Sequence, residues 1–226
     1  MLKIALTAGH YLGTEGRRCP KNLDPNETQE WVLNDRICDK VEKLLSAYDG
    51  YELIRTDDTT GKIGISNTER IKKANDFGAD IYLSIHHNAG IKGGKGGGIV
   101  AYTYTKVDQV TKDWQKELYD ALIKHTGLKG NRATPLATGD YQVLRETKMP
   151  AVILECGFFD SATDCPIILT EEFSDNCAKA IVEVLVKKGK LAKKPTEIVR
   201  NLSAEEFLKE LNELGYSFTI IRREAK

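Results

Sequence analysis

The sequence lacks a net charge and any long apolar run. Lys plus Arg and Asp plus Glu each number 33 in 226 residues, so the formal net charge is zero. This balance removes the bulk electrostatic argument for a nucleic acid partner or an anionic membrane surface. No apolar stretch approaches the ~18–20 residues that a membrane-spanning helix needs. We therefore expect neither nucleic acid binding nor membrane insertion.

The sequence also lacks the patterns of a disulfide framework, of a thiolate zinc finger and of an HExxH protease. Its cysteines are odd in number and form no CxxC pair. They are Cys19, Cys38, Cys156, Cys165 and Cys177. We expect reduced, half-buried packing residues. The apolar run at residues 1–6 is too short for a signal peptide, which predicts synthesis in the cytoplasm without one.

Strand-like and helix-like segments alternate along residues 2–186. β-formers predict strands, and apolar side chains at helical spacing predict helices. The expected strands are 2–8, 51–55, 81–88, 99–104 and 151–159, with a short extended piece at 142–145; the expected helices are 26–47, 69–77, 107–126 and 171–186. This order predicts an α/β fold, with a single twisted, mainly parallel or mixed sheet flanked by helices on both faces.

Side chains with metal-binding chemistry stand at the ends of these elements. His10 follows the first strand, and His86 ends the run Ile81–Ile85. Glu30 lies within roughly 20° of the apolar stripe of the first helix, and Glu155 interrupts an apolar strand. In open α/β sheets, ligands sit beyond the strand ends. From the residues alone, structural roles stay open, because a carboxylate also stabilises a helix N-terminus.

Two imidazoles and one carboxylate, with an open fourth position, are the donor set of hydrolytic zinc sites. A further carboxylate can take a proton from the bound water, whose pKa the ion lowers to ~7. His87 should face the other side of its strand and is not assigned to the metal.

An ordered set of motifs spanning about residues 2–186 resembles the zinc-dependent N-acetylmuramoyl-L-alanine amidases of the Amidase_3 type. The matching pieces are Thr7–His10; Glu30 with Asn34; Arg70 with Ala74, Asn75, Ala79 and Asp80; Ser84–Ala89; Gly97–Ile99 with Tyr102; Val143–Arg145; and Pro150–Phe158. Two positions depart from the family pattern, since Tyr11 replaces a usual glycine and His87 stands where alanine is common.

The resemblance implies one Zn²⁺ per chain, held by His10, Glu30 and His86, with Glu155 as the catalytic carboxylate. The implied substrate is bacterial peptidoglycan, at the amide between the lactyl group of N-acetylmuramic acid and L-alanine, so that cleavage lyses the cell wall. Arg145 could bind a substrate carboxylate, or it could be a structural ion-pair partner.

Two other functions stay open at this point. One is a cysteine-dependent hydrolase using Cys156 with His10 or His86. Cys156 should point away from Glu155 along the strand, so both cannot serve one site. The other is a non-catalytic cell-wall-binding protein with the same fold.

The predicted organisation is a catalytic domain over residues 1–187, a basic linker over 188–200 and a small segment over 201–226. A capping box at Ser203–Glu206 and a strand-like run at 216–221 predict a helix and a strand in the last part. So short a piece is too small for its own core, so we expect it to bind cell wall or mediate self-association. This organisation is that expected of a phage endolysin or a cytoplasmically made autolysin.

Overall fold

The computed structural model describes residues 1–195 and 207–209. The chain divides into two units, Met1–Lys194 and Pro195–Lys226. In the second unit, Phe207–Lys209 are helical, and the expected capping box at 203–206 and strand at 216–221 lie outside the described residues. None of the described helices has the length and apolar character needed to cross a membrane.

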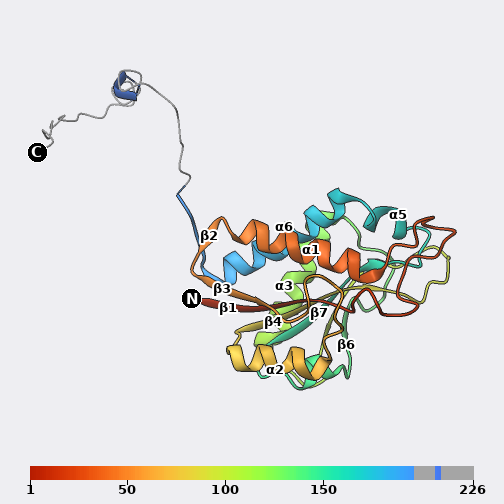
Figure 1. Cartoon of the computed structure of the whole chain (residues 1–226), viewed down its shortest axis with the longest axis horizontal. Coiled ribbons are helices and arrows are strands. Elements are labelled where there is room, and N and C mark those ends of the chain that lie inside the picture. The colour runs from red at the N-terminus through yellow and green to blue at the C-terminus, as the bar shows by residue number, and fades with distance from the viewer. Residues whose placement is uncertain (196–206, 210–226) are drawn as a thin grey trace, which may run out of the picture. The chain divides into compact units, whose positions relative to one another are not determined.

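A six-stranded sheet in the order β3-β1-β4-β7-β5-β6 forms the centre of the first unit (Figure 1). Its strands are β1 (Leu2–Ala8), β3 (Tyr51–Arg55), β4 (Ile81–Asn88), β5 (Ile99–Thr103), β6 (Leu136–Thr138) and β7 (Ala151–Phe158). All neighbouring pairs are parallel except β5 and β7, which are antiparallel. The mixed, mainly parallel sheet that we predicted is confirmed.

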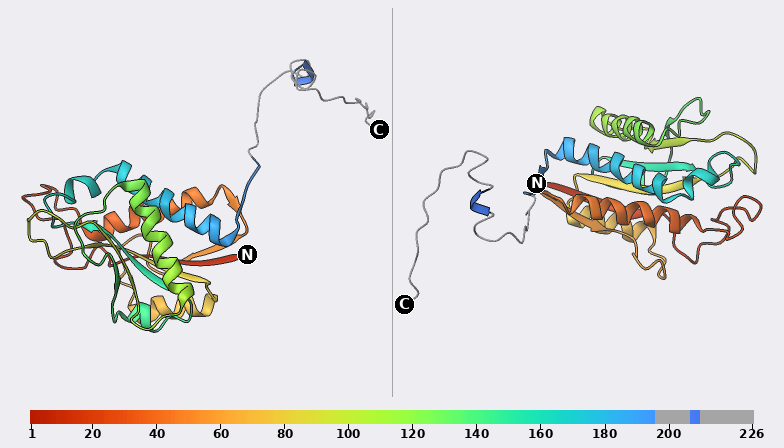
Figure 2. Two further views of the ribbon diagram at one scale, coloured as in Figure 1. Left: turned by 180° about the vertical axis from the view of Figure 1, so that it is seen from behind. Right: turned by 90° about the horizontal axis from the view of Figure 1, so that it is seen from above.

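Helices cover both faces of the sheet, as Figure 2 shows from two directions. They are α1 (Glu30–Leu45), α2 (Asn67–Phe77), α3 (Gln109–Thr126), α4 (Gln142–Arg145), α5 (Cys165–Ile168) and α6 (Glu171–Gly189). On one face, α1, α3 and α6 pack over a core cluster that includes Leu83 and Ile85 of β4. On the other face, α2 and α4 pack over a cluster that includes Tyr82. Successive strand residues therefore face different helices, as strand geometry requires.

Helix α1 begins at Glu30, four residues later than the expected start at Asn26. The residues before it form a closed loop instead. The Asp24 carboxylate accepts hydrogen bonds from the backbone N–H groups of Asn26 and Thr28, at 3.0 and 2.7 Å. Arg18 and Gln29 form an isolated β-bridge. These contacts keep Asn26 in a turn, and they place Glu30 at the start of the helix.

Other elements also differ from the prediction. Ser66 and Glu69 form a capping box at the start of α2, so this helix begins at Asn67, two residues before the expected start at 69. The piece expected to be extended over 142–145 is the short helix α4, and β6 lies where neither a strand nor a helix was predicted. Helix α6 continues to Gly189, and β8 (Ala192–Lys193) pairs with β2 (Tyr48–Asp49). Residues 188–194 of the expected linker therefore belong to the first unit.

Candidate active site

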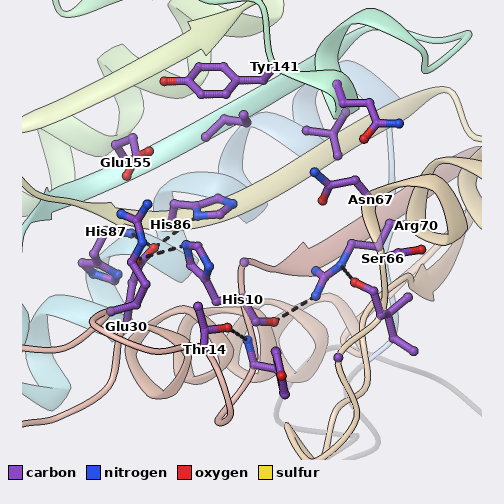
Figure 3. Close-up of a pocket in the computed structure, with 18 of the residues that line it drawn as sticks. His10, Thr14, Glu30, Ser66, Asn67, Arg70, His86, His87, Tyr141 and Glu155 are labelled. Carbon is purple, nitrogen blue, oxygen red and sulfur yellow. Dashed lines mark hydrogen bonds and ion pairs between the residues drawn. The ribbon is translucent and has the colours of Figure 1, made fainter.

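The sheet register brings the candidate metal-binding side chains together. β1 and β4 pair in parallel with Ala8 beside Ile85, so His10 lies just beyond the strand end that carries His86. β4 and β7 pair with His86 beside Glu155. Glu30 approaches from the first turn of α1. Figure 3 shows His10, Glu30 and His86 converging, with Glu155 next to them.

The three side chains meet at hydrogen-bonding distances. His10 Nε2 lies 3.2 Å from Glu30 Oε2, and His86 Nδ1 lies 3.1 Å from Glu30 Oε1. One ligand-type atom from each residue lies within 4.8 Å of the others. Glu30 is almost fully buried, at 1% exposure, whereas both imidazoles are partly open to the pocket. The arrangement is a pocket-facing N,N,O donor set.

Glu30 Oε2 shows that this donor set fits a cation. The atom is buried, and within the described part of the chain it has no hydrogen-bond partner, although His10 Nε2 faces it at 3.2 Å. A buried carboxylate oxygen without a partner is costly, and a cation between these atoms would remove the cost. Two imidazole nitrogens and one carboxylate oxygen are donors that Zn²⁺ takes at catalytic sites.

The charges of the set also suit a cation. Burial alone would raise the pKa of Glu30, but the close imidazoles of His10 and His86 outweigh this effect, and the pKa falls below its usual range. Burial lowers the pKa of His86, partly offset by Glu30. The folded protein therefore favours an ionised carboxylate beside a neutral His86, which are the protonation states that metal binding requires.

Neighbouring polar groups fix the ligand orientations. Ser84 Oγ lies 3.1 Å from His86 Nε2, which leaves Nδ1 directed at Glu30. The backbone N–H of His87 donates to Glu30 Oε1 at 3.1 Å. Such outer contacts hold a ligand's tautomer and direction. The site is thus preorganised by β4 itself.

His87 lies outside the donor set, as its strand position predicted. Its Nδ1 is 2.8 Å from Asn34 Oδ1, on the side of the sheet that α1 covers. Burial lowers the pKa of His87 to about 3, so the ring is neutral. Asn34 in turn donates from Nδ2 to the carbonyl of Gly9 at 3.1 Å. His87 therefore supports the loop that carries His10.

Glu155 is the one candidate whose pKa is strongly raised. Burial, together with the charge of Glu30, raises the pKa of Glu155 to about 8, while Arg17 acts in the opposite direction. Its Oε2 is buried, and no hydrogen-bond partner for it exists among residues 1–195 and 207–209. A carboxyl group that titrates near neutral pH beside a metal set is suited to proton transfer. A bound cation would lower this pKa again.

Arg145 lies outside the pocket that contains these side chains. It forms ion pairs with Asp140 and with Glu146, the latter at 3.1 Å. Of the two roles that the sequence left open for it, these contacts favour the structural one.

Several residues of the pocket were not assigned a role from the sequence. The pocket has a volume of about 670 Å³. Its walls include Tyr11, Arg17, Asn67 and Tyr141. They stand on loops or at helix starts, where no periodic pattern marks them. Of these four residues, only Tyr11 was noted in the sequence, because it departs from the family pattern.

Gly9 leaves the space that the His86 ring occupies. A Cβ at Gly9 would lie 2.0 Å from His86 Cε1. We expect Gly9→Ala to displace the ring, to weaken the binding of a divalent cation such as Zn²⁺ at least tenfold, by about 1.4 kcal/mol, and to destabilise the fold by about 1–3 kcal/mol. Zinc titration against a chelator checks this. Gly94→Ala, whose added methyl would come no closer than 3.1 Å to a neighbour, is the control. Equal zinc affinity in both variants would contradict the prediction.

Comparison with known proteins agrees with this geometry. The Amidase_3 model, described as N-acetylmuramoyl-L-alanine amidase, matches residues 4–187. N-acetylmuramoyl-L-alanine amidase CwlM of Bacillus licheniformis is 29% identical over 195 residues, which are 85% of this chain and 71% of that protein. The sporulation-specific N-acetylmuramoyl-L-alanine amidase of Bacillus subtilis is 30% identical over 79% of this chain and 65% of its own length.

A phage protein and a solved structure are also similar. The endolysin of Bacillus phage SPP1 is 32% identical over 161 residues, which are 70% of this chain and 58% of the endolysin. The chain thus spans 58% to 71% of the lengths of these three relatives. The crystal structure of N-acetylmuramoyl-L-alanine amidase from Clostridium difficile 630 shares the fold, with a TM-score of 0.73 at 24% identity over 82% of this chain and 95% of that one. The chain therefore belongs to the Amidase_3 family of N-acetylmuramoyl-L-alanine amidases, which are hydrolases.

Proposed function

We propose that this chain is a zinc-dependent hydrolase of bacterial peptidoglycan that cleaves the amide between the lactyl group of N-acetylmuramic acid and L-alanine. The observation that carries the proposal is the convergence of His10, Glu30 and His86 in one pocket, with Glu155 beside them. The names of the relatives, which include amidases and an endolysin, support a substrate in the bacterial cell wall.

In this proposal, His10, Glu30 and His86 hold one Zn²⁺ per chain. When bound, the ion polarises the scissile carbonyl and lowers the pKa of water to ~7. The Glu155 carboxylate takes the proton of the attacking water and later returns it to the departing alanine nitrogen. Glu155 can accept and return this proton because its carboxyl group lies in the pocket. Its Oε2 has no hydrogen-bond partner in the described parts of the chain.

The remaining pocket walls suit a substrate with both sugar and peptide parts. Tyr141 is 45% exposed and packs edge-on against Tyr102, with ring centroids 5.5 Å apart. Arg17 and Asn67 add polar groups to the lining. Exposed aromatic faces and polar groups are what a partly apolar, hydrogen-bonding ligand needs.

The structure gives a cysteine mechanism no support. Cys156 is completely buried in the core cluster beneath α1, α3 and α6, whereas its neighbour Glu155 lines the pocket. Burial also leaves a thiol inert as a nucleophile. The five cysteines are free, and each is buried.

Product analysis on purified cell wall tests the proposal. We expect mass spectrometry to find new L-alanine amino termini and intact glycan strands, and turbidity of the wall suspension to fall. A chelator should abolish both signals and added Zn²⁺ should restore them, whereas a thiol-alkylating agent should leave them unchanged.

Each contrary outcome points to a different error. Loss of activity on alkylation, with indifference to chelator, would favour Cys156. New reducing sugar ends or internal peptide termini would contradict the proposed bond. Wall binding without any new termini would favour a non-catalytic binding protein.

A further inference from the structure

Arg70 is a buried cation next to the candidate metal site. It lies in the first turns of α2 and is only 5% exposed. Within the part of the chain that the structure describes, no carboxylate lies at ion-pair distance from it. Buried arginines are usually paired with acids, because an uncompensated buried charge is costly. An exception next to a functional site requires an explanation.

The guanidinium group of Arg70 is instead bonded to neutral oxygens of two segments. Nε donates to the carbonyl of Ile65 at 3.0 Å. Nη1 donates to Thr7 Oγ1 and to the carbonyl of Ala8, the latter at 2.6 Å. Nη2 donates to the carbonyl of His10 at 2.9 Å. Figure 3 shows the guanidinium next to His10. A planar fork of five donors is suited to such divergent contacts, and a lysine is not.

The backbone turn at Ala8–His10, to which Arg70 donates hydrogen bonds, is strained at His10. His10 has φ of 66°, in the left-handed region that residues with a Cβ adopt only rarely. The carbonyls of Ala8 and His10 are bonded to Arg70, and the intervening carbonyl of Gly9 is bonded to Asn34 at 3.1 Å. α2 therefore holds this turn from one face of the sheet and α1 from the other. The strained backbone directs the His10 ring at Glu30.

We propose that Arg70 is a positioning residue, which holds His10 in its left-handed conformation and thereby sets the affinity of the site for a divalent cation. The inference rests on the metal site of the proposed function. Arg70 itself does not bind the metal; it controls metal binding through the backbone of the proposed ligand His10.

The sign of the effect distinguishes positioning from charge. A buried cation repels a nearby metal ion, so electrostatics alone predicts that removal of Arg70 tightens zinc binding. Positioning predicts the opposite, because a relaxed His10 would no longer face Glu30. Loss of a contact that orients a metal ligand typically weakens binding by about 10–100-fold.

Zinc dissociation constants of full-length variants, measured by competition with a chromophoric chelator, test the proposal. We expect Arg70→Ala and Arg70→Lys each to weaken zinc binding by about 10–100-fold, although the second keeps the charge. Guanidinium ion, added below denaturing concentrations, should restore affinity to Arg70→Ala and leave the wild type unchanged. Arg55→Lys is the matched control, because Arg55 is a similarly buried arginine that joins β3 to Asp35 of α1 away from the pocket. Its zinc affinity should stay within twofold of wild type.

Thr7→Val provides a second test if the Arg70 variants do not fold. It removes one acceptor of Nη1 and keeps the arginine, and zinc binding should weaken several-fold. Unchanged or tighter zinc binding in folded Arg70 variants, or in Thr7→Val when those do not fold, would overturn the proposal. If the wild-type chain bound no zinc, the proposed metal site itself would fail, which separates the two outcomes.

Discussion

Glu155→Gln should reduce the rate of amide cleavage by about 10²–10⁴-fold, the usual contribution of a positioned general base, while zinc stays bound at one ion per chain. Glutamine has nearly the shape of glutamate, so the packing of β7 is kept, but its amide cannot accept the proton of water. Glu155 is not one of the three residues whose ligand atoms cluster. Release of alanine amino termini and zinc content, measured on the same preparation, check both parts.

The control for this variant is Glu146→Gln. Glu146 is an exposed carboxylate that pairs with Arg145 just after α4 and lies outside the pocket, so its removal should leave the rate unchanged. If Glu155→Gln lost its zinc, Glu155 would be a ligand. If the variant kept wild-type activity, another group would have to serve as the base.

Glu30→Gln should abolish both zinc binding and activity. The carboxylate faces both imidazoles, and it supplies the one negative charge among the three ligand-type groups. An amide in its place directs either its oxygen or its NH₂ group at each histidine, and it no longer offsets the charge of the ion. We expect zinc affinity to fall by more than the ~10–100-fold that loss of an outer contact costs. Equilibrium dialysis against a zinc buffer measures it.

Glu27→Gln is a close control for this variant, because Glu27 is a half-buried acid in the loop that leads into α1. It should bind zinc as the wild type does. Near-normal zinc affinity in Glu30→Gln would show that the ion is held elsewhere.

Periodicity predicted the sheet well, because strand runs such as Ile81–Ile85 are decided by local composition. The same patterns placed His10 and His86 at the ends of neighbouring strands, which meet at one edge of a parallel sheet. The choice of three ligands and a base came from the family resemblance and stays a prediction. The start of α1 was predicted four residues too early, for a tertiary reason. Asn26 has good capping chemistry, but Asp24 holds its backbone in a turn. The helix α4 is too short for any period to appear.

The supporting residues of the site could not be predicted in the same way. Arg70 was visible as part of a motif, but its partners are the backbone carbonyls of Ala8 and His10, which are 62 and 60 positions away and carry no side-chain signal. Arg145 shows the reverse difficulty. A cation beside a motif can face substrate or acids, and only the fold places it against Asp140.

The proposed amidase activity requires one zinc ion held by three side chains from distant parts of the sequence. Diffraction from a crystal of the zinc-loaded chain, recorded at the zinc absorption edge, tests this most directly. We expect a single anomalous peak per chain, about 2.0–2.2 Å from nitrogens of His10 and His86 and from an oxygen of Glu30. A peak at any other group of residues, or none at this site in a crystal grown with zinc, would contradict it.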